Sequence, residues 1–130
     1  MEEEKDKFGK EKISELGGDL GNNMIAQINR LHPPYAKFIK DSVATMNSDS
    51  LLSQRERDII RLSSLITVGG SLVQVKNSVR MILKNGVFNR NEIGEILMQT
   101  SFFCGFSPAL TAAFVALEAI DEFNEEVTKT

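Results

Sequence analysis

The chain has 130 residues, of which 42% are hydrophobic and 25% charged, with a formal net charge of −3. This length suits a single domain, and the hydrophobic fraction can supply a core. Lysines and arginines are scattered among acids and no apolar run is long enough to cross a bilayer, so we expect neither a nucleic-acid nor a membrane partner.

The first 20 residues are mostly charged and are interrupted by glycines at positions 17 and 18. We expect a loosely attached helix or a frayed tail there. The acidic start, Met1–Lys7, is the opposite of a basic segment followed by an apolar one, so it predicts a cytoplasmic protein. We therefore expect an extension over residues 1–20 and one helical domain over residues 21–130.

Two short helices are predicted next, over residues 22–31 and 34–46. Between them stands His32-Pro33-Pro34. Proline disfavours a helical conformation in the residue before it, so the break falls at His32-Pro33.

A capping box begins the next predicted helix. In Ser53-Gln54-Arg55-Glu56 the Ser53 hydroxyl can accept from the Glu56 amide, while the Glu56 carboxylate reaches back to the Ser53 amide. The helix ends at Gly69-Gly70, where a left-handed residue meets no Cβ clash.

Three more helices follow with their own boundary signals. Ser71–Gln74 reads as a second capping box, and Asn85-Gly86 ends that helix. Asn89–Glu92 opens the next helix, which Gly105 breaks.

Ser107-Pro108 predicts an N-cap followed by proline at the first position of the last helix. From residue 109 to about 125 this helix is apolar around nearly its whole circumference, so it must be buried on all sides. No alternating strand pattern occurs. The expected fold is an all-α, single-domain bundle of about six helices.

Four segments in order, residues 55–65, 79–86, 91–97 and 102–110, resemble the carboxymuconolactone decarboxylase family, which shares the fold of alkylhydroperoxidase D-like proteins. The resemblance covers roughly residues 30–125. It implies an all-helical protomer that assembles into a homohexamer, commonly a trimer of dimers.

The sequence departs from this family at its catalytic segment. Peroxidase members carry C-x-x-C-x-x-x-H, where this chain offers Ser71, Gln74 and Ser78, or Asn77 with a shift of one residue. Because Cys104 is the single cysteine, a thiol-dependent antioxidant activity is disfavoured. Decarboxylase members usually keep the histidine, and neither serine nor asparagine titrates near neutral pH.

The resemblance nevertheless suggests charged candidates for a site. Arg80 matches the arginine of the family's H-x-R pattern and could bind a carboxylate in bidentate fashion, or form a salt bridge within the protein. Asp58 lies near the family's usual acidic position, which relays protons in peroxidase members, or it complements the helix dipole. Glu56 is either an acid–base residue or only part of its cap.

Two uncharged candidates complete the set. Ser78 could orient a substrate by hydrogen bonding. Cys104 stands among Phe102, Phe103 and Phe106 with no basic residue nearby, which favours a core or pocket-lining role over a nucleophile. One histidine and one cysteine cannot supply a zinc site, so we expect no metal and no cofactor.

The leading hypothesis is a decarboxylase-like (lyase-type) protein that acts on or binds a small carboxylated organic molecule. Arg80 would hold the substrate carboxylate, and Asp58 or Glu56 would donate the proton. The alternative is a non-catalytic oligomer that binds a ligand or has a structural role. In both cases we expect the chain to associate with itself, because the apolar last helix needs more cover than one protomer offers. The resemblance implies that the assembly is a hexamer.

Overall fold

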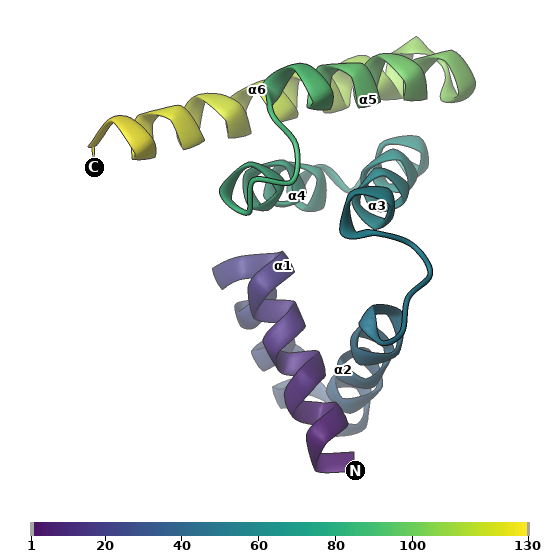
Figure 1. The fold of residues 1–130 in the computed structure, drawn as a ribbon, viewed down its shortest axis with the longest axis vertical. Coiled ribbons are helices and arrows are strands. Elements are labelled where there is room, and N and C mark those ends of the chain that lie inside the picture. Colours follow the sequence, from purple (N-terminus) through teal and green to yellow (C-terminus); the bar gives the residue numbers. More distant parts are fainter. Residues whose placement is uncertain (1, 130) are drawn as a thin grey trace. The chain divides into compact units, whose positions relative to one another are not determined.

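The computed structural model describes residues 2–129, which form six helices and no strand (Figure 1). This confirms the predicted all-α class. The helices are α1 (Glu2–Leu31), α2 (Pro33–Asn47), α3 (Gln54–Val68), α4 (Leu72–Lys84), α5 (Arg90–Cys104) and α6 (Phe106–Lys129).

The chain divides into two compact units, with the boundary after Leu51. The first unit holds α1 and α2, and the second holds α3 to α6. The boundary expected after residue 20 instead falls inside α1. The charged segment continues as helix to Leu31 with one non-helical residue, Gly18, whose φ of 62° and ψ of −151° suit a residue without a Cβ.

Close packing of small residues joins α1 to α2 in the first unit. A Cβ on Gly9 would lie 2.1 Å from the carbonyl oxygen of Lys40, so only glycine permits this approach. Ala36 and Ala44 are fully buried in the same unit, and Asp6 pairs with the Lys40 ammonium group at 2.7 Å. The predicted break is confirmed, because α2 begins at Pro33.

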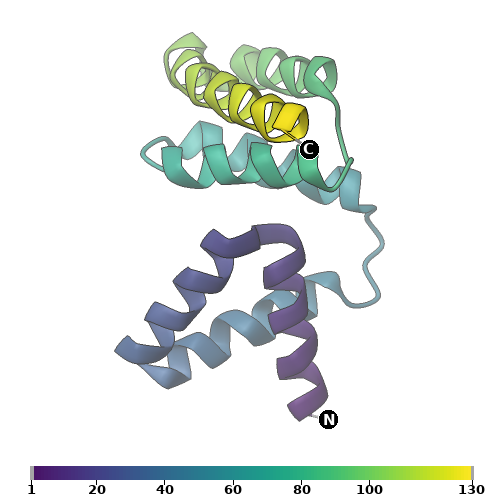
Figure 2. The ribbon, with the colours of Figure 1, turned by 90° about the vertical axis from the view of Figure 1, so that its left-hand side faces the viewer.

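The four helices of the second unit form two layers, with α5 and α6 side by side over α3 and α4 (Figures 1 and 2). Aliphatic side chains from α3, α4 and α5 meet the alanines of α6 in the core. The core consists of Leu62, Ile66, Val75, Val79, Ile82, Phe88, Ile93, Ile96, Ala109, Ala112, Ala116, Ala119 and Ile120.

Of the two predicted capping boxes, the one at Ser53 is confirmed, and a further box opens α5 at Asn89, where only a helix start was predicted. Both reciprocal hydrogen bonds are present in the boxes that open α3 and α5, at Ser53 and Asn89. The box predicted at Ser71 is wrong, because its side chain makes no capping hydrogen bond. The ψ of Ser71 is 41°, whereas the N-caps of α3 and α5 have extended backbones.

The last helix begins earlier than predicted. It starts at Phe106, directly after Gly105 with φ 95°, so Ser107 and Pro108 lie within its first turn. Proline is tolerated there because the first amides of a helix have no carbonyl partner in the helix.

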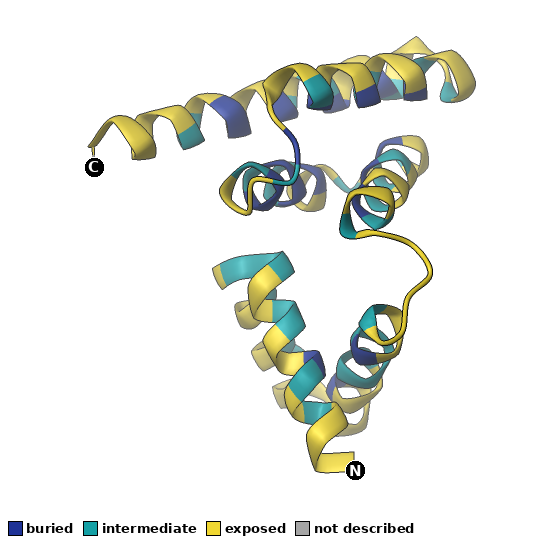
Figure 3. Cartoon of the chain, viewed as in Figure 1, coloured by how far each residue is buried: buried dark blue, intermediate teal, exposed yellow. Residues whose placement is uncertain are grey.

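The expectation that α6 is buried on all sides is wrong for the single chain. Ala112, Ala116 and Ala119 are buried, whereas Phe114 is 70% exposed. Figure 3 shows buried residues along one side of α6 and exposed residues along the other. The reason is the two-layer arrangement, in which the other helices of the unit cover only the alanine side of α6.

Candidate functional site

Arg80 belongs to a ladder of ion pairs between α4 and α6. Lys76 and Arg80 lie one turn apart on α4, and Glu118, Glu122 and Glu126 recur every four residues on α6. The Lys76 ammonium is 2.7 Å from the Glu122 carboxylate, and the Arg80 guanidinium contacts Glu122 at 3.7 Å and also Glu126. The protein itself therefore supplies the anionic partner of Arg80.

Asp58 is the most deeply buried of the charged candidates. Its carboxylate accepts from the Arg61 guanidinium at 2.7 Å and from the Gln54 amide at 3.0 Å. Burial raises the pKa of Asp58, and the attraction of Arg61 and the Gln54 hydrogen bond only partly oppose that shift. This carboxyl group consequently holds its proton more tightly than an exposed aspartate.

Glu56 lies exposed and is engaged in its cap. Its carboxylate accepts from the Ser53 amide at 2.8 Å, and the Ser53 hydroxyl accepts from the Glu56 amide at 3.1 Å. These hydrogen bonds with Ser53 lower the pKa of Glu56 because they favour the charged form. A lowered pKa on an exposed cap residue favours the capping role over that of a proton donor.

The two uncharged candidates lie on different helices. Ser78 is buried on α4. Cys104 ends α5, packs against the core, and places its Sγ 3.4 Å from the carbonyl oxygen of Gly105. The charged candidates Asp58, Glu56 and Arg80 each bond to residues outside the candidate set, so their interactions do not join these five residues into one site.

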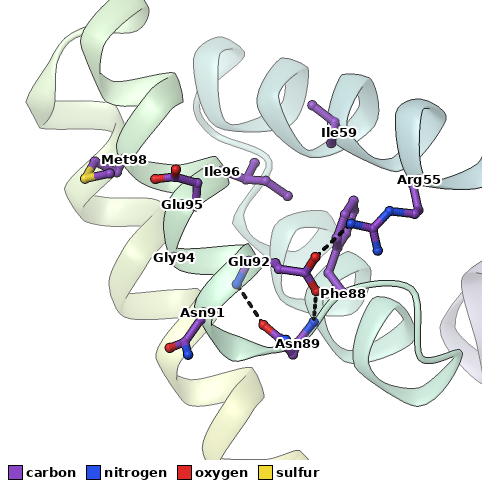
Figure 4. Close-up of a pocket in the computed structure, with 10 residues that line it drawn as sticks. All are labelled: Arg55, Ile59, Phe88, Asn89, Asn91, Glu92, Gly94, Glu95, Ile96 and Met98. Carbon is purple, nitrogen blue, oxygen red and sulfur yellow. Dashed lines mark hydrogen bonds and ion pairs between the residues drawn. The ribbon is translucent and has the colours of Figure 1, made fainter.

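A groove between α3 and α5, which sequence reasoning missed, has a volume of about 730 Å³ (Figure 4). Arg55 spans one end, 2.7 Å from the Glu92 carboxylate and 2.7 Å from the carbonyl oxygen of Val87. The Arg55 guanidinium also lies 4.4 Å from the centre of the Phe88 ring. The sequence did contain a signal for this groove, because Arg55 and Glu92 each lie in the first turn of a helix that a capping box opens.

A smaller cavity of about 240 Å³ lies where the Gly69-Gly70 turn meets the start of α6. Its lining is mainly apolar, with the hydroxyl groups of Ser107 and Thr111 among the exceptions. None of the five candidate residues lines this cavity or the α3–α5 groove.

A group of exposed apolar residues lies at the end of α5 and along α6. We call it the α6 face, and it consists of Phe102, Phe103, Phe106, Leu110, Phe114 and Leu117. Phe102 and Phe103 are each 82% exposed, and their rings meet edge to face with centres 5.2 Å apart. Sequence reasoning identified these aromatic residues but placed them in a pocket. Phe106, Leu110, Phe114 and Leu117 recur at intervals of three or four residues and so share one side of α6, and an exposed apolar patch of this kind marks an association site.

Two further features are absent from the described residues. No helix within residues 2–129 has both the length and the apolar character needed to cross a membrane. The same residues contain no cluster of three or more histidines, cysteines, aspartates or glutamates that could hold a metal ion.

Comparison of the chain with protein-family models, with curated proteins and with solved structures gives no match.

Proposed function

We propose that the protein functions as a homo-oligomer whose copies pack together over the α6 face. The observation that supports this proposal is the exposure of four phenylalanines and two leucines at the end of α5 and along α6. Removing a phenylalanine or leucine side chain from water stabilises the buried state by about 1.5–3 kcal/mol. Since every copy presents the same face, a second copy offers a surface of matching chemistry.

This proposal assigns the chain the role of a non-catalytic structural member of an assembly. It is supported by the ion pairs of Arg80 with Glu122 and Glu126, which stabilise the contact of α4 with α6 and occupy the guanidinium. The resemblance to the carboxymuconolactone decarboxylase family implies six copies, and that number is part of the proposal.

Light scattering on two charge variants tests the role of the α6 face. Phe114→Glu places a carboxylate at the centre of the face and should reduce the measured mass toward 14.5 kDa, the mass of one chain. Val73→Glu is the matched control, since Val73 is 62% exposed but lies on α4, outside the face. Equal masses for wild type and Phe114→Glu would overturn the proposal.

A second candidate function is decarboxylase-like chemistry on a small carboxylated molecule. The observation that favours it is the buried carboxyl group of Asp58, whose pKa is raised by burial, because a raised pKa makes a carboxyl group better suited to proton transfer near neutral pH. In this proposal Arg80 exchanges Glu126 for the substrate carboxylate.

A thermal-shift screen of small mono- and dicarboxylates tests this second candidate. Binding should raise the melting temperature of the wild type, and Arg80→Met should abolish the rise. The absence of any shift in the wild type, or an equal shift in both proteins, would count against the assignment.

A further inference from the structure

One side of α6 carries a single row of exposed residues whose character changes along the helix. Phe106, Leu110, Phe114 and Leu117 recur at intervals of three or four residues, so they lie in line over about 16 Å. The same row continues beyond Leu117 with Asp121, which is exposed. The row is therefore apolar from Phe106 to Leu117 and acidic at Asp121.

From this pattern we propose that two copies pair their α6 helices antiparallel, about a two-fold axis at the level of Ala112. This inference rests on the association proposed above. Leu110 lies two residues before that level and Phe114 two residues after it. Leu110 of one copy therefore meets Phe114 of the other. Phe106 lies six residues before the axis and Leu117 five residues after it, so Phe106 of one copy also meets Leu117 of the other. One register thus covers all four apolar residues of the row.

The charges on α6 favour this direction over a parallel pair. In a parallel pair Asp121 and Glu125 would lie beside the same acids of the second copy, and like charges repel. In the antiparallel pair Asp121, nine residues from the axis, extends about 4.5 Å past Phe106, the first residue of α6 in the second copy. A helix N-terminus carries partial positive charge and unbonded amides, so an acid is stabilised there.

The row is open on the single chain, since its four apolar residues are between 44% and 73% exposed. α6 has 24 residues and its neighbour α5 has 15, so the last turns of α6 run beyond the start of α5 (Figure 1). Phe102, Phe103, Phe106 and Phe114 of two copies would together bury about 1,000–1,500 Å², given the usual area of an aromatic side chain. This area approaches the range of stable protein interfaces, before the leucines are counted.

Distances between spin labels at two single sites test the direction of the pair. Both variants are made in a Cys104→Ser background, which removes the only cysteine, and their masses are checked against the wild type. The sites are Thr111→Cys, one residue from the axis, and Asn124→Cys, twelve residues from it; both positions are exposed. The antiparallel pair predicts helix backbones about 10 Å apart at position 111 and about 36 Å apart at position 124.

The possible outcomes separate this inference from the proposal on which it rests. A short distance at both sites indicates a parallel pair and overturns the inference. An oligomer without a short distance at position 111 also overturns it, but leaves association through the α6 face intact. A mass of one chain overturns both.

The placement of Asp121 has its own test. Asp121→Asn should weaken association about two- to five-fold, because it removes an acid from the first turn of the helix in the second copy. Glu125→Asn is the control, since Glu125 lies about 10 Å past that helix start and its effect should be smaller. Equal effects of the two variants on the dissociation constant would contradict the proposed register.

Discussion

Arg80 shows how a residue's partners decide between two roles that a sequence leaves open. Its guanidinium pairs with Glu122 and Glu126, and its side chain is 39% exposed, so water screens part of the interaction. The position of Arg80 beside the apolar stripe of α4 was readable from helical spacing. Its partners were not, because they lie more than 40 residues further along the chain.

We expect Arg80→Met to lower the free energy of unfolding by less than about 1 kcal/mol, because partly exposed ion pairs contribute little. The loss should shrink in high salt, which screens the wild-type pair. Urea unfolding at low and high salt measures both effects, with Lys84→Met on the same helix as the control. A loss several times larger, unchanged by salt, would show that Arg80 stabilises more than this ladder.

Asp58 makes a pH-dependent contribution to stability whose sign follows from its raised pKa. The folded protein binds this proton more tightly than the unfolded chain, where the pKa is near 3.8. The contribution is therefore fully present below the unfolded pKa and is lost as pH rises through the folded pKa.

Asp58→Asn removes this titration while keeping a similar shape. The stability of the wild type relative to Asp58→Asn should fall as the pH is raised from below 3.8 through the folded pKa. Urea unfolding of both proteins across the acidic range measures the difference. Parallel pH profiles, or a wild type that gains on the variant with rising pH, would contradict the raised pKa.

At the scale of elements, local sequence signals predicted most helix boundaries. They did not predict which helices pack against each other. The box at Ser53, the helix start at Asn89 and the break at His32 each depend on residues within a turn of each other, and all three were predicted. The failure at Ser71 and the early start of α6 depend on backbone angles at the preceding turns. The close approach of α1 to α2 at Gly9 was missed, because glycine in a charged segment suggested fraying.

Gly9→Ala should destabilise the first unit by about 1–3 kcal/mol, since its new Cβ would overlap the backbone of Lys40. Gly17→Ala is the matched control on the same helix, because a Cβ there meets no atom within 4 Å. It should be neutral or stabilising by up to about 1 kcal/mol.

Fluorescence of Tyr35, the only tyrosine in a chain without tryptophan, reports unfolding of this unit. An equal effect of both glycine variants on that signal would show that α1 and α2 do not meet at Gly9.

At the scale of the whole molecule, the sequence predicted an all-α class and a surplus of apolar surface on the last helix. It placed that surplus around the whole of α6, whereas in the structure the alanine side of α6 is buried and Phe106, Leu110, Phe114 and Leu117 are exposed. Sequence pattern cannot locate such a face, because burial depends on which neighbours reach each side. The five candidate site residues were likewise chosen without knowledge of their partners. In the structure the three charged ones form hydrogen bonds or ion pairs with residues outside the candidate set.

The central claim is that the α6 face is covered by other copies of the chain. Sedimentation velocity of the unmodified protein at about 10 µM, a concentration at which an obligate oligomer remains assembled, tests this claim most directly. We predict a species at least twice as heavy as the 14.5 kDa chain, and six times as heavy if the family resemblance holds. A single species of 14.5 kDa would contradict the account.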